Sequence, residues 1–245
     1  MNAAVKDAAR ARAYSTPLDA IDVSDAGHFQ DDTLWPYFER LRREDPVHYC
    51  KDSPHGPYWS VTKFNDIMKV DTNHKVFSSR HDLGGITLFN IPEQMRRPNF
   101  ISMDPPKHDE QRKVVSPIVA PGNLANLEGL IRSRACAILD GLPRNETFDW
   151  VDRVSIELTT QMLATLFDFP FEDRRLLPYW SDVVTGVPQS RGEHKDFWAW
   201  RDAELAKCLT YFTRLWNERV NAPPRHDLIS MLAHAPATRN MGGPE

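Results

Sequence analysis

The residues of this chain best suited to chemistry lie in one short string, Asp104-Pro105-Pro106-Lys107-His108-Asp109-Glu110-Gln111-Arg112. Asp104 could cap a helix by accepting a bond from an early backbone N–H, and proline is well tolerated in the first turn of a helix. Four residues separate His108 from Arg112, so both would project from one face. The positive end of the helix and its unpaired N–H groups would add to their charge. The string therefore predicts a site for an acidic ligand, because a guanidinium holds a carboxylate through two parallel N–H bonds.

Spacing alone favours a simpler interpretation, a solvated basic helix face. The whole string changes that balance, because Asp-Pro-Pro-x-His-x-x-x-Arg resembles the helix C motif of bacterial cytochromes P-450. In that family the His and Arg of this motif bind the haem propionates. The resemblance therefore implies that His108 and Arg112 bind haem b.

The resemblance extends from about Asp31 to the end of the chain. It is strongest toward the bacterial alkane and fatty-acid terminal hydroxylases of the family. The segments that carry this finer resemblance are Ser78-Ser79-Arg80-His81, Gly84-Gly85-Ile86-Thr87-Leu88, Phe100-Ile101-Ser102-Met103-Asp104 and Val119-Ala120-Pro121-Gly122-Asn123-Leu124.

The sequence does not contain the iron ligand of this family, a cysteine in a Phe-x-x-Gly-x-x-x-Cys-x-Gly loop. Cys50 lies in an alternating strand pattern, and Cys136 and Cys208 lie in helical patterns, so all three are expected to be small packing residues. The Glu-x-x-Arg helix and the oxygen-activating helix of the family are not recognisable either. We therefore expect the N-terminal half of a monooxygenase, with the catalytic residues and the iron ligand in the C-terminal half and no metal-binding residue here.

Composition is typical of a folded domain, with 41% hydrophobic and 26% charged residues. The net charge of −4 argues against a nucleic-acid partner. Three cysteines at irregular spacing give no disulfide framework or zinc pattern. No apolar run reaches the length of a membrane span. These features predict a cytoplasmic protein.

Residues 1–30 are predicted to form an N-terminal arm, ahead of one domain over residues 31–245. The first fourteen residues carry Lys6, Arg10 and Arg12 among alanines and have no hydrophobic core of a signal sequence. A short amphipathic helix is the alternative interpretation of this segment.

Residues 31–245 are predicted to be mainly α with a small β-sheet, the N-terminal portion of the cytochrome P-450 fold. A helix is expected after Asp31-Asp32-Thr33, with Leu34, Phe38 and Leu41 on one face and a stop at Pro46. Strands are expected over 47–50 and 58–62. Further helices are expected over 63–72, 123–141, 149–170, 171–185 and 193–220. The buried stripe of the last helix is expected to consist of Trp198, Leu205, Leu209, Phe212 and Trp216.

Two regions are candidates for an apolar substrate pocket. The segment from Arg80 to Met103 is a long connection without clear periodicity, and such loops are usually functional or disordered. Its apolar residues Ile86, Leu88, Phe89 and Phe100 should be covered, and the resemblance places this region over the haem. The second region runs from Leu176 to Pro188, where Leu177, Val183 and Val184 could line a channel mouth. Ordinary core packing remains the alternative for both regions.

An apolar pocket suits a hydrocarbon chain, because each buried CH₂ group contributes roughly 0.8 kcal/mol. The resemblance implies hydroxylation of an apolar substrate such as the terminal methyl of an alkane or fatty acid. It also implies ferredoxin and ferredoxin reductase as partners. The alternative is a catalytically inert helical binding or interaction protein derived from the same fold.

Overall fold

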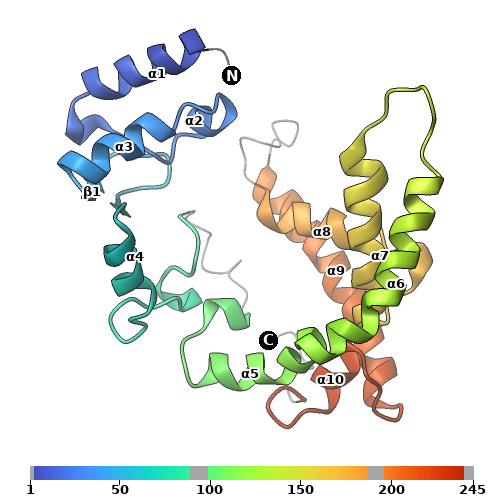
Figure 1. Cartoon of the computed structure of the whole chain (residues 1–245). Coiled ribbons are helices and arrows are strands. Elements are labelled where there is room, and N and C mark those ends of the chain that lie inside the picture. Colours follow the sequence, from blue (N-terminus) through green and yellow to red (C-terminus); the bar gives the residue numbers. More distant parts are fainter. Residues whose placement is uncertain (1–2, 89–98, 187–195, 240–245) are drawn as a thin grey trace. The chain divides into compact units, whose positions relative to one another are not determined.

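The computed structural model describes residues 3–88, 99–186 and 196–239 (Figure 1). The described chain is mainly helical with one two-stranded sheet, which confirms the predicted fold class. It divides into two compact units, unit 1 over Met1–Pro105 and unit 2 over Pro106–Glu245. The single domain over residues 31–245 and the separate arm stay predictions. In the described ranges, no helix has the length and apolarity needed to cross a bilayer.

Unit 1 combines a small sheet with short helices. Its strands β1 (Val47–Cys50) and β2 (Tyr58–Val61) pair antiparallel, with Val47 opposite Val61 and Cys50 opposite Tyr58. This hairpin and the two helices that flank it match the prediction to within a few residues. The helices of unit 1 are α1 (Ala3–Ser15), α2 (Ala26–Gln30), α3 (Trp35–Glu44) and α4 (Phe64–Asp71).

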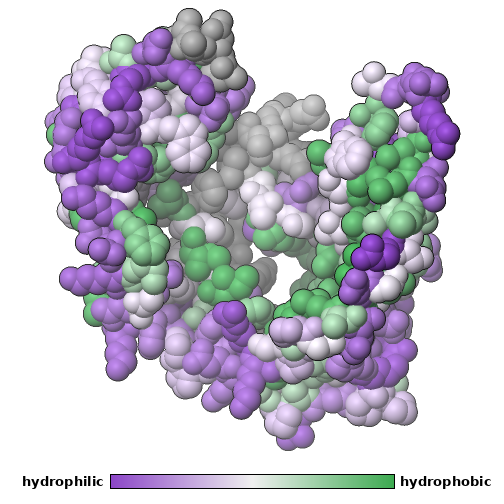
Figure 2. All heavy atoms as spheres, in the orientation of Figure 1, coloured by the Kyte–Doolittle hydropathy of each residue, from purple (hydrophilic) through white to green (hydrophobic). Residues whose placement is uncertain are grey.

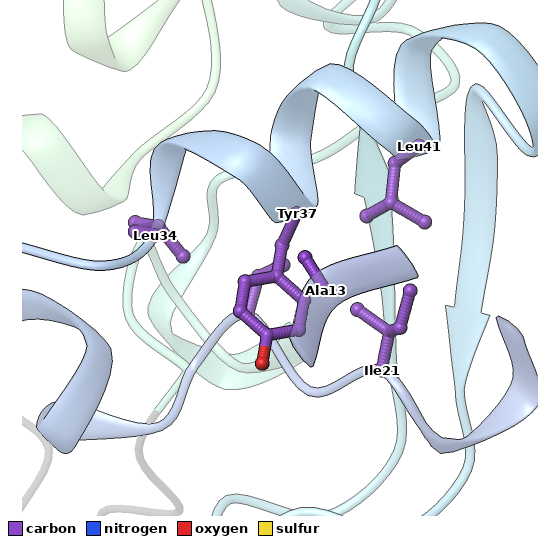
Figure 3. Close-up of a cluster of buried hydrophobic side chains, with 6 residues drawn as sticks. Ala13, Ile21, Leu34, Tyr37 and Leu41 are labelled. Carbon is purple, nitrogen blue, oxygen red and sulfur yellow. The ribbon is translucent and has the colours of Figure 1, made fainter. Parts of the chain in front are cut away.

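The favoured prediction of an arm for the first fourteen residues differs from the structure, in which α1 is a helix packed on α3. Figure 3 shows how Ala13 of α1 lies among Ile21, Leu34, Tyr37 and Leu41, and all five are buried. A helix forms here because its alanine face removes apolar surface of α3 from water. Composition could not reveal that α1 packs on α3, because alanine favours a helix but does not determine which element the helix contacts.

Polar side chains complete the attachment of the N-terminal segment. Arg40 of α3 is buried and donates to the backbone carbonyls of Ala13, at 2.7 Å, and Thr16, where a cation satisfies the end of α1. His48 of β1 is also buried, with Nδ1 2.8 Å from the Asp45 carboxylate and Nε2 2.9 Å from the Ile21 carbonyl. These hydrogen bonds attach the N-terminal segment to α3 and β1.

The described residues of unit 2 form helices and connecting turns, with no strand. Its helices are α5 (Lys107–Val115), α6 (Pro121–Asp140), α7 (Glu157–Phe167), α8 (Leu176–Thr185), α9 (Phe197–Val220) and α10 (Leu228–His234). A π-helical turn, Val151–Ile156, leads into α7. The helix expected from Asn123 begins two residues earlier, at Pro121, because proline suits a first turn. Helix α10 was not among the expected helices; Asp227 caps it by accepting the N–H of Ser230 at 2.8 Å.

The core of unit 2 lies among α7, α8, α9 and α10. Its buried residues are Ala164, Phe169, Trp180, Leu215 and Ile229. Hydrophobic residues also gather at the surface over α6 and α7 (Figure 2), and no residue of α6 is fully buried. The strongest packing of this unit is therefore between α8, α9 and their neighbours.

The stripe predicted for α9 is wrong at Leu209, whose side chain is 51% exposed. The buried residues of α9 are instead Phe197, Arg201, Leu215 and Arg219. The Arg219 guanidinium donates to the carbonyl and to the carboxylate of Asp168, both at 2.9 Å. Hydrogen bonds of this kind let a long charged side chain occupy a position that a hydrophobic pattern assigns to a leucine.

Candidate functional site

The helix predicted to carry His108 and Arg112 is confirmed as α5. Spacing by four residues places both side chains on one face, about one turn apart. Gln111 is buried and marks the face of α5 that packs inside unit 2. The packing of α5 therefore fixes the helix from which these two side chains project.

The two side chains differ in their surroundings. His108 is partly buried, with Nδ1 2.8 Å from the carboxylate of Asp109, which orients the ring. Arg112 is exposed, and within the described part of the chain its guanidinium has no hydrogen-bond or ion-pair partner. One face of α5 thus presents an oriented imidazole and an available guanidinium. This donor set fits a ligand with two carboxylates, such as the propionates of haem.

Asp104 does not cap α5, so that prediction is wrong. The helix begins at Lys107 without a side-chain cap. The Asp104 carboxylate instead accepts the Ser78 hydroxyl at 2.6 Å and the Ser79 backbone N–H at 3.0 Å. These two hydrogen bonds lower the pKa of Asp104. The prolines move the helix start away from Asp104, so its carboxylate bonds to donors of unit 1.

The first pocket region belongs to unit 1. Ile86 and Leu88 are 56% and 49% exposed, and Phe100 is half-buried in the short turn Phe100–Ser102. Phe89 lies outside the described residues. The described part of the structure does not cover Ile86 and Leu88, although the sequence predicted that these side chains would be covered.

The second pocket region is α8, in unit 2. Val183 is fully buried, whereas the next residue, Val184, is 51% exposed. Leu177 packs partly buried against the core cluster of unit 2. The Val184 backbone carbonyl accepts from Arg201 of α9 at 3.2 Å, and burial lowers the pKa of this arginine. Of the three predicted residues, Val184 is the one whose side chain is available to a ligand.

The candidate site residues therefore fall into three groups. His108 and Arg112 share one face of α5, Val183 and Val184 lie on α8, and Ile86 and Phe100 lie in the loop of unit 1. Sequence reasoning missed the link between Asp104 and Ser78. Residue types alone do not indicate this link, because the aspartate could equally have capped the helix that follows it.

The cysteines occupy different environments. Cys50 is buried in β1, Cys208 is half-buried and Cys136 is exposed. Burial raises the pKa of the Cys208 thiol to about 11, which keeps it protonated and unsuited to metal binding at neutral pH. In the described ranges, no three His, Cys, Asp or Glu side chains are grouped so that they could hold a metal ion. Packing is thus the role that Cys50 and Cys208 fit.

The known proteins that this chain resembles are cytochromes P-450 or monooxygenases. No family model matches the sequence. Among curated proteins, linalool 8-monooxygenase from Pseudomonas putida is 31% identical over 208 residues, which is 81% of this chain and 50% of that protein. Steroid C26-monooxygenase from Mycolicibacterium smegmatis is 31% identical over 80% of this chain and 47% of its own length. The chain spans about half the length of the curated relatives that it matches.

Two solved structures resemble the chain closely. Cytochrome P-450 153 from Novosphingobium aromaticivorans is 39% identical with a TM-score of 0.79, over 89% of this chain and 54% of that one. CYP153D17 from a Sphingomonas species is 41% identical with a TM-score of 0.78, over 90% of this chain and 55% of that one. In sequence and in fold, the chain belongs to the cytochrome P-450 superfamily, and it corresponds to the N-terminal half of that fold.

Proposed function

We propose that this chain is the part of a haem-thiolate monooxygenase that binds the haem propionates and contributes to an apolar substrate pocket. The observation that carries the proposal is the face of α5, where His108 and Arg112 lie one turn apart. Arg112 has no competing partner in the described part of the chain. Relatives that are named as monooxygenases support the same activity.

His108 and Arg112 would bind the two propionates. Ionised carboxylates that are partly buried need charge compensation, and an imidazole and a guanidinium on one face supply it. Asp109 holds the His108 ring through Nδ1, at 2.8 Å, and so limits its rotation. The role of these residues is therefore to retain and orient the cofactor.

When bound, the haem would supply the oxygen chemistry, with a cysteine thiolate as the protein ligand of its iron. The environments of Cys50 and Cys208 do not suit that ligand, because burial raises the pKa of both thiols, and Cys136 does not lie in the family's cysteine loop motif. We infer that the thiolate comes from the portion of the family fold that lies outside this chain. The residues of this chain would then bind and orient the haem and the substrate, and they would exclude water from the pocket.

The proposed substrate is an alkane or fatty acid that is hydroxylated at its terminal methyl. Support comes from the resemblance of segments 78–81, 84–88 and 100–104 to the terminal hydroxylases. Two relatives are named for linalool and for steroids, which are also apolar molecules. The exposed residues Ile86 and Leu88, together with Phe100 of the same loop, would contact the hydrocarbon, at about 0.8 kcal/mol for each CH₂ group buried.

Electrons are proposed to arrive from ferredoxin and ferredoxin reductase, as in the bacterial members of the family. These partners would deliver electrons to the haem, so their role depends on the proposal that the protein binds haem.

The experiment that tests the proposal compares haem retention in the full-length gene product and its Arg112→Ala variant. We expect the variant to lose haem on desalting, because one propionate loses its guanidinium. Haem per protein is measured by absorbance, and the iron-carbonyl spectrum reports the thiolate. Arg132→Ala is the control, because Arg132 lies on α6 and forms only an exposed ion pair with Glu128. Equal haem occupancy in all three proteins would overturn the assignment of Arg112, and a wild-type protein without haem would favour the inert binding protein.

A further inference from the structure

One carboxylate closes the base of the loop that carries the first pocket region. Asp104 Oδ2 accepts the Ser78 hydroxyl at 2.6 Å, and Asp104 Oδ1 accepts the Ser79 N–H at 3.0 Å. Both oxygens are used, so the two ends of a long connection, 26 residues apart in sequence, are held together.

The arm that follows Ser79 is turned back on itself. The Arg80 carbonyl accepts the N–H groups of Leu83, at 3.0 Å, and Gly85, at 2.9 Å. Gly84 and Gly85 have φ angles of 120° and 77°, which L side chains rarely adopt. This turn leads directly into Ile86 and Leu88.

The arm that precedes Asp104 is also ordered. Asn99 caps the turn Phe100–Ser102 by accepting the Ser102 N–H at 3.1 Å, and Ser102 and Met103 are buried. The two arms lie side by side, because a Cβ placed on Gly85 would be 3.9 Å from the Ser102 hydroxyl. The position of one arm therefore depends on the position of the other.

We propose that Asp104 is a positioning residue for the substrate, which fixes the two arms that carry Ile86, Leu88 and Phe100. The proposal rests on the proposed function, in which these three side chains contact the hydrocarbon. Ile86 and Leu88 are exposed, so their own burial holds the first arm in place only weakly. Hydrogen bonds to a charged carboxylate are about twice as strong as neutral ones. The carboxylate of Asp104 is therefore the group on which the position of this wall depends.

The test uses the full-length gene product with Asp104→Ala, Ser78→Ala and Ser78→Thr. The Asp104→Ala change removes both bonds, Ser78→Ala removes one, and Ser78→Thr keeps the hydroxyl. Asp82→Asn is the control, because Asp82 is a carboxylate of the same loop that forms only an exposed ion pair with Arg80. The readouts are hydrogen exchange over residues 79–88, haem content, and the dissociation constant of dodecanoic acid from the haem absorbance shift.

We expect the dissociation constant to rise by about tenfold in Asp104→Ala, which corresponds to a loss of about 1.4 kcal/mol of binding free energy. Exchange over residues 79–88 should become faster, while haem content stays at the wild-type level. Ser78→Ala should show the same changes to a smaller extent, and Ser78→Thr and Asp82→Asn should bind like the wild type. A KM that rises more than kcat falls would support positioning over general damage.

Wild-type affinity and exchange in Asp104→Ala would overturn the proposal, even if haem binding is normal. If Asp104→Ala does not fold, the same criterion applies to Ser78→Ala: wild-type affinity and wild-type exchange in that variant would overturn the proposal. A wild-type protein that takes neither haem nor dodecanoic acid would overturn the proposed function and, with it, the substrate role of Asp104. Exchange that is unchanged in Asp104→Ala despite intact haem would overturn the role of Asp104 alone.

Discussion

The two candidate pocket walls are held by different forces. In unit 2, α8 packs on α9 through aromatic rings, with the buried Trp180 5.6 Å from Tyr211 and 6.1 Å from Phe212 between ring centroids. In unit 1, Ile86 and Leu88 are exposed, and hydrogen bonds to Asp104 hold the base of their loop.

Because of this difference, we expect the two walls to respond differently to mutation. Apolar burial is spread over many atoms of a shared core, so a lost side chain lowers the stability of the whole of unit 2. Loss of the Asp104 bonds should free a local segment without unfolding its unit. We infer that α8 gives a stable wall and that the loop gives an adjustable one.

The largest effect is expected for Trp180→Ala. Removing a buried aromatic side chain costs about 3–5 kcal/mol of the free energy of unfolding. Trp150→Ala is the matched control, because Trp150 is 53% exposed. Urea unfolding followed by far-UV circular dichroism measures both. Equal losses in the two variants would mean that the aromatic cluster does not hold α8.

A second comparison uses two neighbouring valines of α8. Val183 is fully buried and Val184 is 51% exposed. We expect Val183→Ala to cost about 1.5–3 kcal/mol of the free energy of unfolding and Val184→Ala less than about 0.5. Only Val184→Ala should weaken dodecanoic acid binding in the full-length protein without a loss of stability. The opposite pattern would reverse the assignment of these residues.

A third prediction concerns the polar part of the α8–α9 wall. The Tyr211 hydroxyl donates to the Asp173 carboxylate at 2.6 Å, and burial together with this bond raises the pKa of Tyr211 to about 12. Tyr211→Phe should cost about 1 kcal/mol, less than Trp180→Ala, because the ring contacts remain.

The stability that Tyr211 gains from its raised pKa is fully present below about pH 10 and is lost as the pH rises through about 12. Alkaline unfolding of the wild type and of Tyr211→Phe should therefore converge at high pH. A constant difference up to pH 12 would contradict the role of the phenol.

The smallest effect on global stability is expected at Asp104. Hydrogen bonds from Ser78 and Ser79, with the nearby charges of Arg80 and His74, lower the pKa of this carboxyl in the fold. A lowered pKa stabilises the folded state above the ordinary value of about 4 and ceases to do so as the pH falls below it. Exchange over residues 79–88, corrected for its intrinsic pH dependence, should be constant from pH 7 to 5 and rise below about 4. An unchanged profile in Asp104→Ala would refute this.

The elements that sequence predicted well are those fixed by local pattern. The alternating run at Val47–Cys50 and the apolar face of Leu34, Phe38 and Leu41 each depend on near neighbours. The residues that sequence reasoning missed depend on distant backbone groups. Arg40 donates to the Ala13 carbonyl, 27 residues away, and Arg219 donates to Asp168, 51 residues away. Any carbonyl can accept such a bond, so residue types do not identify the partner.

The candidate site also combines residues placed by local sequence pattern with residues placed by contacts distant in sequence. The spacing of His108 and Arg112 was predictable, because helical periodicity places residues four apart on one face. Asp104 was assigned to the wrong partner, because an aspartate before proline can cap a helix or bond a distant serine with equal chemistry. Only the three-dimensional course of the chain decides between the two.

The 26-residue separation of Ser78 and Asp104 also has a consequence for the time course of synthesis. A ribosome adds about 5–20 residues per second, so Ser78 precedes its carboxylate partner by roughly 1–5 s. The residues that form the helix and hairpin core around Leu41 have all been made before Asp104 appears. Ile86 and Leu88 therefore emerge from the ribosome before the carboxylate that positions them emerges. During that interval the nascent chain presents an untethered apolar segment to chaperones and proteases.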